Sequence, residues 1–320
     1  MKKNRWFAAL VVMVMALAFA GCSDGSSENE FATGSSGESG NSSGAGNSGV
    51  NIPEGFVKVK GTTITGTEEW TPSSSVFVSG RSLTIPDLYV CDHEVTRGEF
   101  KEVMGTDPST ASAYDKDGNK LTGDAVLNNP VNYVNWYDAI AYCNKLSLKE
   151  NLTPCYSVSG VTDLENLAYS SIPTSSNSTW NALTYDKEAD GYRLPTEAEW
   201  EWLARGGENY TYAGSNTVDA VAWYTTNTND TGTREVKTKK ANGYELYDMS
   251  GNVFEWCYDW YDDTVSSSTA DTGASSGSNH VRRGGSWFNY DSRCQVSFRL
   301  YVSPSQRIND IGFRVVRSAN

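Results

Sequence analysis

The sequence predicts an α+β fold with few helices, many short strands and long loops. Short segments that alternate apolar and polar residues recur along the chain, beginning with residues 56–60, and a period of two is typical of strands. Capping signals mark the ends of a small number of helices. Residues 107–129 and 262–280 are polar and rich in Gly, Ser and Thr, so we expect surface loops there. These features favour one α+β domain over residues 53–320.

Five segments are predicted as strands. Residues 56–60, 76–78 and 88–90 lie in the first third of the chain, and residues 281–283 and 313–316 lie near its C-terminus. Each segment contains at least one Val, and β-branched residues fit the pleated surface of a sheet.

Three segments are predicted as helices. Thr96 with Glu99, and Thr196 with Glu199, have the spacing of capping boxes, in which each side chain bonds the other residue's backbone N–H. The helix that follows Thr196 is expected to end at Gly206. Between these two helices, apolar residues recur at helical spacing on one face, at Trp136, Ile140, Cys143 and Leu146.

The N-terminus has the pattern of an export signal. A positively charged start is followed by an apolar run over residues 7–20, too short to span a bilayer comfortably. The run ends in Ala20-Gly21-Cys22, which resembles a lipobox, so residues 1–21 are predicted as a lipoprotein signal peptide and Cys22 as the lipidated residue. The alternative is an ordinary signal peptide with an incidental Cys. Residues 22–52 are almost all Ser, Gly, Asn and Glu and are expected to form a flexible tether.

Composition narrows the set of partners. The formal net charge is −13, and an acidic surface repels phosphate backbones and anionic lipid. We therefore expect no nucleic-acid partner, contact with the membrane through the N-terminal lipid only, and a monomer.

An exported protein can form disulfides, but five cysteines remain after Cys22, so at least one thiol stays free and the pairing is open.

Several motifs in a fixed order resemble the formylglycine-generating-enzyme, or sulfatase-modifying-factor, superfamily, which has a C-type-lectin-like fold. They are residues 192–201 (YRLPTEAEWE), 246–256 (LYDMSGNVFEW), 283–287 (RGGSW) and 312–314 (GFR), preceded by 94–96 (EVT). Each motif alone is mostly structural, and the set identifies the family. The resemblance implies the α+β, C-type-lectin-like fold of this enzyme family from about residue 55 onward.

The resemblance implies no oxidase chemistry. The oxidases of this family bind Cu(I) through two cysteine thiolates, and the equivalent positions here are Cys294 and Asn289. An amide is a hard, neutral ligand and does not replace a soft thiolate. A related iron-dependent branch needs a histidine-rich site, whereas this chain has only His93 and His280. The alternative function is an oxidase, or another enzyme of the superfamily, that uses Cys294 with an unusual partner.

The resemblance also implies a structural calcium site, although no cofactor is required by this interpretation. The ligands would be Asp248, the carbonyl groups of Gly251 and Val253, and Glu255, which together make a plausible set for a hard cation. An equally weighted alternative is that Asp248 caps the turn and Glu255 pairs with an Arg.

The C-terminal segment resembles the variable region of diversity-generating-retroelement proteins, a class that includes a lipoprotein of Treponema with this fold. In those systems template adenines, largely in AAC codons, are randomised, which cannot produce Lys, Glu, Gln, Met or Trp. None of those five residues occurs at the candidate positions within residues 284–320. The candidate positions are Phe288, Asn289, Tyr290, Asp291, Ser292, Arg293, Phe298, Leu300, Tyr301, Val302, Ser303, Ser305, Ile308, Asn309 and Asp310.

This mixture of aromatic residues with Ser, Asn, Asp and Arg is typical of binding surfaces. We therefore predict a non-catalytic lipoprotein in the cell envelope, displayed on the outer membrane surface, which binds protein or other macromolecular ligands through this segment. The candidate side chains are expected to be exposed, above a buried layer that includes Trp287, Val296, Phe313 and Val315.

Overall fold

The computed structural model describes residues 52–319 of the chain. The predicted signal peptide, the lipidation of Cys22 and nearly all of the predicted tether lie outside the described residues.

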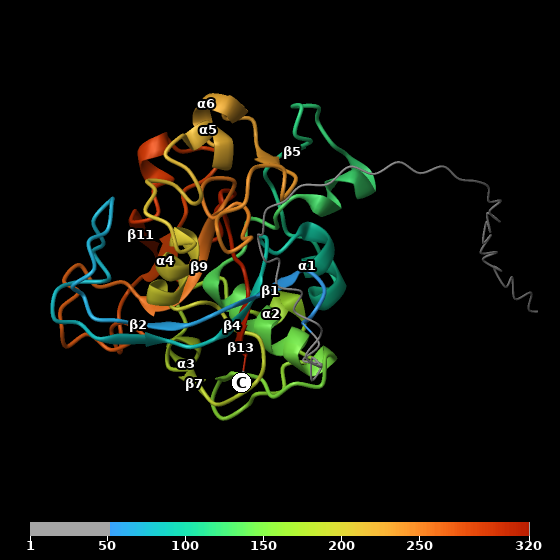
Figure 1. Cartoon of the computed structure of the whole chain (residues 1–320). Coiled ribbons are helices and arrows are strands. Elements are labelled where there is room, and N and C mark those ends of the chain that lie inside the picture. The colour runs from blue at the N-terminus through green and yellow to red at the C-terminus, as the bar shows by residue number, and fades with distance from the viewer. Residues whose placement is uncertain (1–51, 320) are drawn as a thin grey trace, which may run out of the picture. The chain divides into compact units, whose positions relative to one another are not determined.

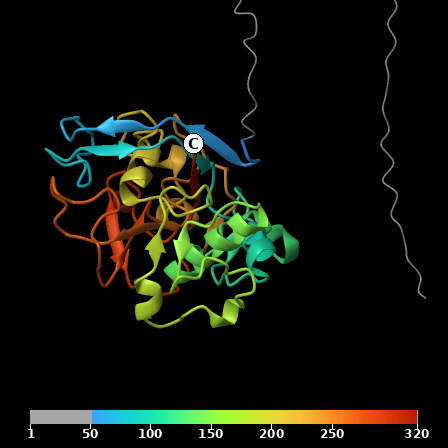
Figure 2. The same cartoon turned by 90° about the horizontal axis from the view of Figure 1, so that it is seen from below.

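Two sheets form the framework of the described part. The first has the order β1-β4-β13 and joins β1 (Phe56–Val59) and β13 (Val316–Ser318) to the two sides of β4 (Leu88–Cys91), all antiparallel. Figures 1 and 2 show the blue β1 beside the red C-terminal end of the chain. The two ends of the domain therefore stabilise one another through a shared strand.

The second sheet positions the C-terminal segment. Its order is β11-β10-β9-β12, with β9 (Phe254–Trp260), β10 (His280–Arg283), β11 (Arg299–Val302) and β12 (Ile311–Gly312). The β9, β10 and β11 pairs are antiparallel, and β12 is parallel to β9. The candidate binding residues thus lie in the loops before and after β11, and in β11 itself.

The remaining elements are short. The two-stranded pairs are β2 (Thr62–Ile64) with β3 (Leu83–Ile85), β5 (Ala113–Tyr114) with β8 (Thr233–Arg234), and β6 (Tyr156–Ser157) with β7 (Thr184–Tyr185). The helices are α1 (Arg97–Met104), α2 (Trp136–Lys149), α3 (Ser178–Asn181), α4 (Glu197–Arg205), α5 (Val218–Val221) and α6 (Thr225–Thr228), with 3-10 turns η1 (Gly123–Asn128), η2 (Tyr169–Ser171) and η3 (Asp291–Arg293). The predicted α+β class is confirmed.

The helix ends form as the sequence indicates. Both capping boxes are present, since Thr96 and Glu99 bond each other's backbone N–H, and Thr196 and Glu199 do the same. Helix α4 ends at Gly206, whose φ of 62° lies in the left-handed region that favours glycine. The predicted helix over 136–146 is also confirmed and extends to residue 149.

Two buried clusters make up most of the core. One surrounds α1 and α2 and includes Trp136, Trp256 and Phe313. The other packs the apolar face of α4, with Trp200 at its centre, against β3 and β4. Both clusters extend to the C-terminal segment, so the loops around β11 rest on a packed layer of side chains.

One predicted strand was wrong, and a second was wrong in part. Residues 76–78 form no strand, because Ser74 Oγ accepts the backbone N–H groups of Val76 and Phe77 at 3.0 and 2.8 Å and holds a turn. The segment 313–316 is irregular up to residue 315, and β13 begins at Val316. Between β12 and β13 the chain passes from one sheet to the other, which interrupts regular pairing.

No helix within residues 52–319 is long and apolar enough to cross a membrane. The described cysteines, Cys91, Cys143, Cys155, Cys257 and Cys294, are all buried free thiols.

Candidate functional site

The candidate site begins at a tight backbone turn after β10. Gly284 and Gly285 have φ values of 93° and 75°, which glycine adopts at no steric cost. A Cβ atom on Gly285 would lie 2.8 Å from the Arg293 carbonyl oxygen and 2.9 Å from Cys294 Sγ. The close approach allowed by this glycine folds the loop 286–294 back onto its own start.

In this loop, buried side chains that anchor the backbone alternate with exposed side chains. Trp287 is 6% exposed, and its backbone N–H donates to the Asn252 carbonyl at 2.8 Å. Phe288 and Tyr290 are 56% and 73% exposed, although large apolar side chains are usually buried. Asp291, Ser292 and Arg293 follow them on the surface. This loop therefore presents aromatic and polar groups above a fixed Trp.

The residues after the loop are less exposed. Phe298, Leu300, Val302 and Ile308 are half-buried and pack against the first core cluster, whereas Asn309 is exposed and Ser303 is half-buried. The Arg293 guanidinium lies 6.0 Å from the centre of the Phe298 ring, which connects the two parts of the segment. We name the exposed and half-buried candidates on this side the variable-segment surface: Phe288, Tyr290, Asp291, Ser292, Arg293, Phe298, Leu300, Val302, Ser303, Ile308 and Asn309.

Tyr301 lies apart from this surface. It is 45% exposed, but successive residues of a strand point to opposite faces, so Tyr301 faces away from Leu300 and Val302. Its ring packs on Tyr261, with 4.3 Å between ring centroids. The expected exposure of Tyr301 is confirmed, and its assignment to ligand binding stays a prediction.

Three further candidates, Asn289, Ser305 and Asp310, are buried, and the expectation that they are exposed was also wrong. Their exposed fractions are 8%, 9% and 7%. Ser286 Oγ lies 2.9 Å from Asn289 Oδ1 and 3.0 Å from Asp310 Oδ2. Polar groups that leave water need such partners, so Asn289 and Asp310 fasten the two ends of the segment together. Ser305 Oγ likewise bonds Ser303 Oγ at 3.2 Å.

The buried layer beneath the surface forms as expected. Trp287, Val296, Phe313 and Val315 are between 0 and 6% exposed. Phe313 lies edge-on to Tyr142, with ring centroids 5.2 Å apart.

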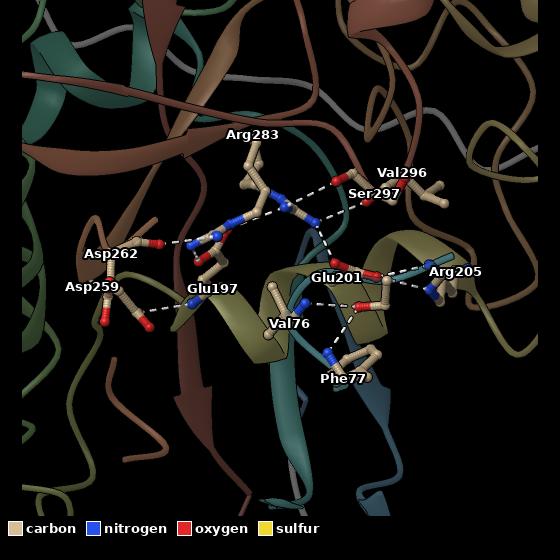
Figure 3. A network of polar contacts seen from close by, with 12 residues as sticks. Val76, Phe77, Glu197, Glu201, Arg205, Asp259, Asp262, Arg283, Val296 and Ser297 are labelled. Atoms are coloured by element: carbon tan, nitrogen blue, oxygen red, sulfur yellow. Dashed lines mark hydrogen bonds and ion pairs between the residues drawn. The ribbon is translucent and has the colours of Figure 1, made fainter. Parts of the chain in front are cut away.

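Arg283 connects this layer to helix α4 (Figure 3). Its guanidinium lies 3.1 Å from Glu197 and 2.6 Å from Glu201, and it also donates to the Val296 carbonyl at 2.9 Å. Arg283 and Glu201 are fully buried, and Glu201 also pairs with Arg205 at 2.7 Å. The sequence placed Arg283 in a motif but did not indicate this function, because Glu197 and Glu201 lie more than 80 residues away.

The position expected for oxidase chemistry is apolar. Cys294 is fully buried and packs with Tyr212, Val221 and Tyr224. Burial raises the pKa of its thiol to about 12, so the thiolate that metal binding and nucleophilic attack require is disfavoured.

The two histidines lie in separate buried environments. His280 stacks between Trp136 and Trp260, with centroid distances of 3.8 and 3.7 Å, and burial lowers its pKa to about 3. Burial alone would lower the pKa of His93, but Cys91, Asp92 and Glu99 raise it to about 12. Both pKa values lie far from 7, and a general acid or base works best when its pKa is near the operating pH.

The residues implied for calcium do not fit a cation site as a set. Both oxygens of Glu255 bind Arg314, at 2.7 and 2.8 Å, and one also accepts from Trp200 Nε1 at 2.7 Å. A guanidinium on the carboxylate repels a second cation. For Glu255 the structure therefore favours the alternative, an ion pair with an Arg, whereas calcium binding stays a prediction.

The other three implied ligands take part in the turn. Asp248 Oδ2 accepts the Lys237 backbone N–H at 2.8 Å, its Oδ1 has no partner, and burial raises the pKa of the carboxyl to about 6. Gly251 and Val253 donate backbone N–H groups to the Gly284 carbonyl and to Glu94. Residues 52–319 contain no group of three or more His, Cys, Asp or Glu side chains arranged to hold a metal ion.

This fold and its motifs define a class of protein. The chain matches the sulfatase-modifying factor enzyme 1-like domain over residues 37–319 and belongs to that family. The fold is therefore the C-type-lectin-like fold of the formylglycine-generating-enzyme type, as the motifs indicated.

The relatives include a variable protein, a chaperone protein and an enzyme. Variable protein 1 of Treponema denticola is 38% identical, with a TM-score of 0.72, and the match covers 82% of this chain and 94% of that one. Chaperone protein LppX of Paenibacillus barcinonensis is 36% identical over 259 residues, 75% of this chain and 83% of the relative. The formylglycine-generating enzyme of Streptomyces coelicolor is 36% identical over 162 residues, 44% of this chain, and the chain spans about half (51%) of that enzyme's length. The similarity to variable proteins inferred from the C-terminal segment is confirmed.

The buried ion pairs of Arg283 give a prediction for stability. Arg283→Leu removes the buried cation that Glu197 and Glu201 share and leaves them only Arg299 and Arg205 as partners. Breaking a buried pair from one side costs about 3–5 kcal/mol. Arg293→Leu is the matched control, because Arg293 is exposed and exposed changes cost less than about 0.5 kcal/mol. Urea unfolding of both variants measures the difference. Equal losses in the two variants would show that the Arg283 network does not stabilise the domain.

Proposed function

We propose that this protein is a lipid-anchored envelope protein that binds macromolecular ligands through its variable-segment surface and catalyses no reaction. The observation that carries the proposal is the exposure of Phe288 and Tyr290, among short polar residues, on a loop whose anchoring residues are buried. Aromatic side chains supply contact area at low entropic cost, and Ser, Asn, Asp and Arg supply adaptable hydrogen bonds.

The similarity to a variable protein supports the same proposal. The relative named a chaperone protein supports a protein ligand over a small molecule. The buried thiol of Cys294 and the amide of Asn289 argue against the oxidase alternative, since neither offers the pair of thiolates that Cu(I) requires.

Tyr290 is expected to be a binding hot spot. Tyr290→Ala removes a side chain that is 73% exposed, so the free energy of unfolding should change by less than about 0.5 kcal/mol. Loss of a hot-spot aromatic costs about 2 kcal/mol of binding energy, or about 30-fold in Kd. The measurement uses peptides selected from a random display library on the chain from residue 23 onward, with affinities compared by calorimetry.

Tyr301→Ala is the matched control, because Tyr301 is an exposed Tyr of the same segment on the opposite face of β11. Binding that is unchanged in Tyr290→Ala and Phe288→Ala for most selected peptides would refute the proposed surface. Sequencing of residues 284–320 in a cell population tests diversification separately. Substitutions should be concentrated at the exposed candidates, with a near-copy of these codons beside a reverse-transcriptase gene.

Lipidation is predicted at Cys22. Cys22→Ser removes the thiol that would carry diacylglycerol, so the protein should move from the membrane fraction to the soluble fraction of fractionated cells. Detergent partitioning in Triton X-114 measures the change, and Cys294→Ser serves as a control that keeps Cys22. If the Cys22→Ser protein still partitions into detergent, the lipid anchor is not at this residue.

The absence of oxidase activity is tested directly. The purified chain, supplied with Cu(I) and oxygen, should leave a Cys-containing sulfatase peptide unchanged in mass and should bind no stoichiometric copper. The Streptomyces coelicolor enzyme, run in parallel, shows that the assay detects conversion. Copper-dependent conversion by this chain would contradict the non-catalytic proposal.

A further inference from the structure

A second candidate site lies outside the variable segment, around the buried side chain of Arg234. A pocket of about 320 Å³ has a lining that includes Tyr114, Lys116, Asp117, Trp223, Thr228 and Arg234. Its size is at the lower end of the range for small-ligand sites. The lining comes from β5, β8 and the region of α6, and Figure 1 shows α6 and β5 at the same end of the domain. Sequence analysis missed it because the residues span more than 100 positions without a motif.

Arg234 is a buried cation without a carboxylate partner. It is 4% exposed, and no ion pair to it forms among residues 52–319. Its Nη1 donates to the Gly232 carbonyl at 3.0 Å and lies 3.4 Å from the Thr233 carbonyl oxygen, its Nη2 lies 3.5 Å from both Thr228 O and Thr231 Oγ1, and its Nε has no partner. Contacts of 3.5 Å are weak hydrogen bonds, so much of the donor capacity of this guanidinium is unused.

Arg81 provides a comparison, because it is a buried arginine whose guanidinium makes short hydrogen bonds. It is also buried and has no ion pair within residues 52–319, but it donates three hydrogen bonds of 2.6–3.2 Å to carbonyl oxygens. Burial of a charge is costly unless it is paired or fully hydrogen-bonded. Compared with Arg81, Arg234 makes longer hydrogen bonds and has an Nε without a partner, so an anion would improve its surroundings.

The walls of the pocket suit an organic anion. The Arg234 guanidinium lies 4.8 Å from the Tyr114 ring centre and 5.5 Å from that of Trp223, and both rings also line the pocket, where they offer flat apolar contact area. Lys116 lies at the rim and adds positive charge, although it pairs with Asp117 at 2.8 Å. Arginine donates in a planar fork that matches the two oxygens of a carboxylate or sulfo group.

We propose that this pocket binds an oxyanion, a carboxylate or a sulfo group, that is carried on a flat organic body. The pocket adjoins the loop 286–294, which carries part of the variable-segment surface, because Thr225 N–H donates to the Asn289 carbonyl at 2.9 Å and Thr228 Oγ1 donates to the Trp287 carbonyl at 2.6 Å. A ligand of that surface can therefore place an anionic group here. This second role rests on the proposed function, whereas oxyanion binding by the pocket does not.

The test uses three small probes on the full chain at constant ionic strength: sodium benzoate, sodium benzenesulfonate and neutral benzamide. At least one of the two anions should bind with a millimolar Kd, and benzamide should bind at least about tenfold more weakly, since hydrogen bonds to charged groups are worth about 1.5–3 kcal/mol. Calorimetry gives the affinities, and the NMR signal of the Arg234 Nε–H reports the site. Tighter binding of benzoate identifies a carboxylate site, and tighter binding of benzenesulfonate identifies a sulfo site. Equal affinity for benzamide and the anions overturns the proposal.

Variants distinguish anion binding in this pocket from anion binding elsewhere on the protein. Arg234→Lys keeps the charge but loses the fork, and should weaken anion binding by about tenfold or more. Lys116→Gln, an exposed change that is not expected to affect folding, should weaken it by about two- to fivefold, and Lys101→Gln on α1 should not change it. If Arg234→Lys does not fold, the Lys116→Gln result and the shift of the Arg234 Nε–H signal still test whether anions bind in this pocket. Tyr290→Ala should leave anion binding unchanged, so failure of the variable-segment surface and failure of this pocket give different results.

Discussion

The attachment of Arg283 to helix α4 is the interaction on which the candidate binding surface depends. The guanidinium pairs with Glu197 and Glu201 on one side and donates to the Val296 carbonyl on the other. Because these groups are buried, water cannot replace a lost partner. Arg283 thereby fixes the backbone between the two exposed parts of the segment, and it does so through a carbonyl group that every residue type possesses.

Other residues also hold the C-terminal segment through its backbone groups. Ser250 Oγ donates to the Cys294 carbonyl at 2.7 Å, Thr228 Oγ1 donates to the Trp287 carbonyl at 2.6 Å, and Thr211 accepts the Val296 N–H through its own carbonyl at 3.0 Å. Framework residues thus hold the segment by its main chain. A surface fixed in this way can change its side chains without losing its shape, which is the physical requirement for a variable binding site. Asn289 and Asp310 are exceptions, because their side chains take part in holding the loop.

Local signals in the sequence predicted the regular elements well. The capping boxes at Thr96 and Thr196 depend on residues three apart, and both form as expected. The failures depend on distant contacts. Tyr301 and Leu300 are neighbours in sequence, and only the pairing of β11 with β10 decides which of them faces the variable-segment surface. Likewise, Glu255 pairs with Arg314, 59 residues later, and no local pattern distinguishes this ion pair from a calcium ligand.

The Arg234 pocket differs in charge from most of the protein surface. A net charge of −13 disfavours anions over most of the surface, whereas the pocket combines a buried, unpaired arginine with an exposed lysine. The pocket residues lie between 114 and 234, outside the segment 284–320, so changes in the variable side chains leave them intact. Under the two proposals, the pocket supplies a constant preference for an anionic group, and the variable segment supplies contacts that differ from one sequence to the next. Such a division would orient every ligand in the same way, since one fixed charge contact restricts how a ligand can approach the aromatic residues beside it.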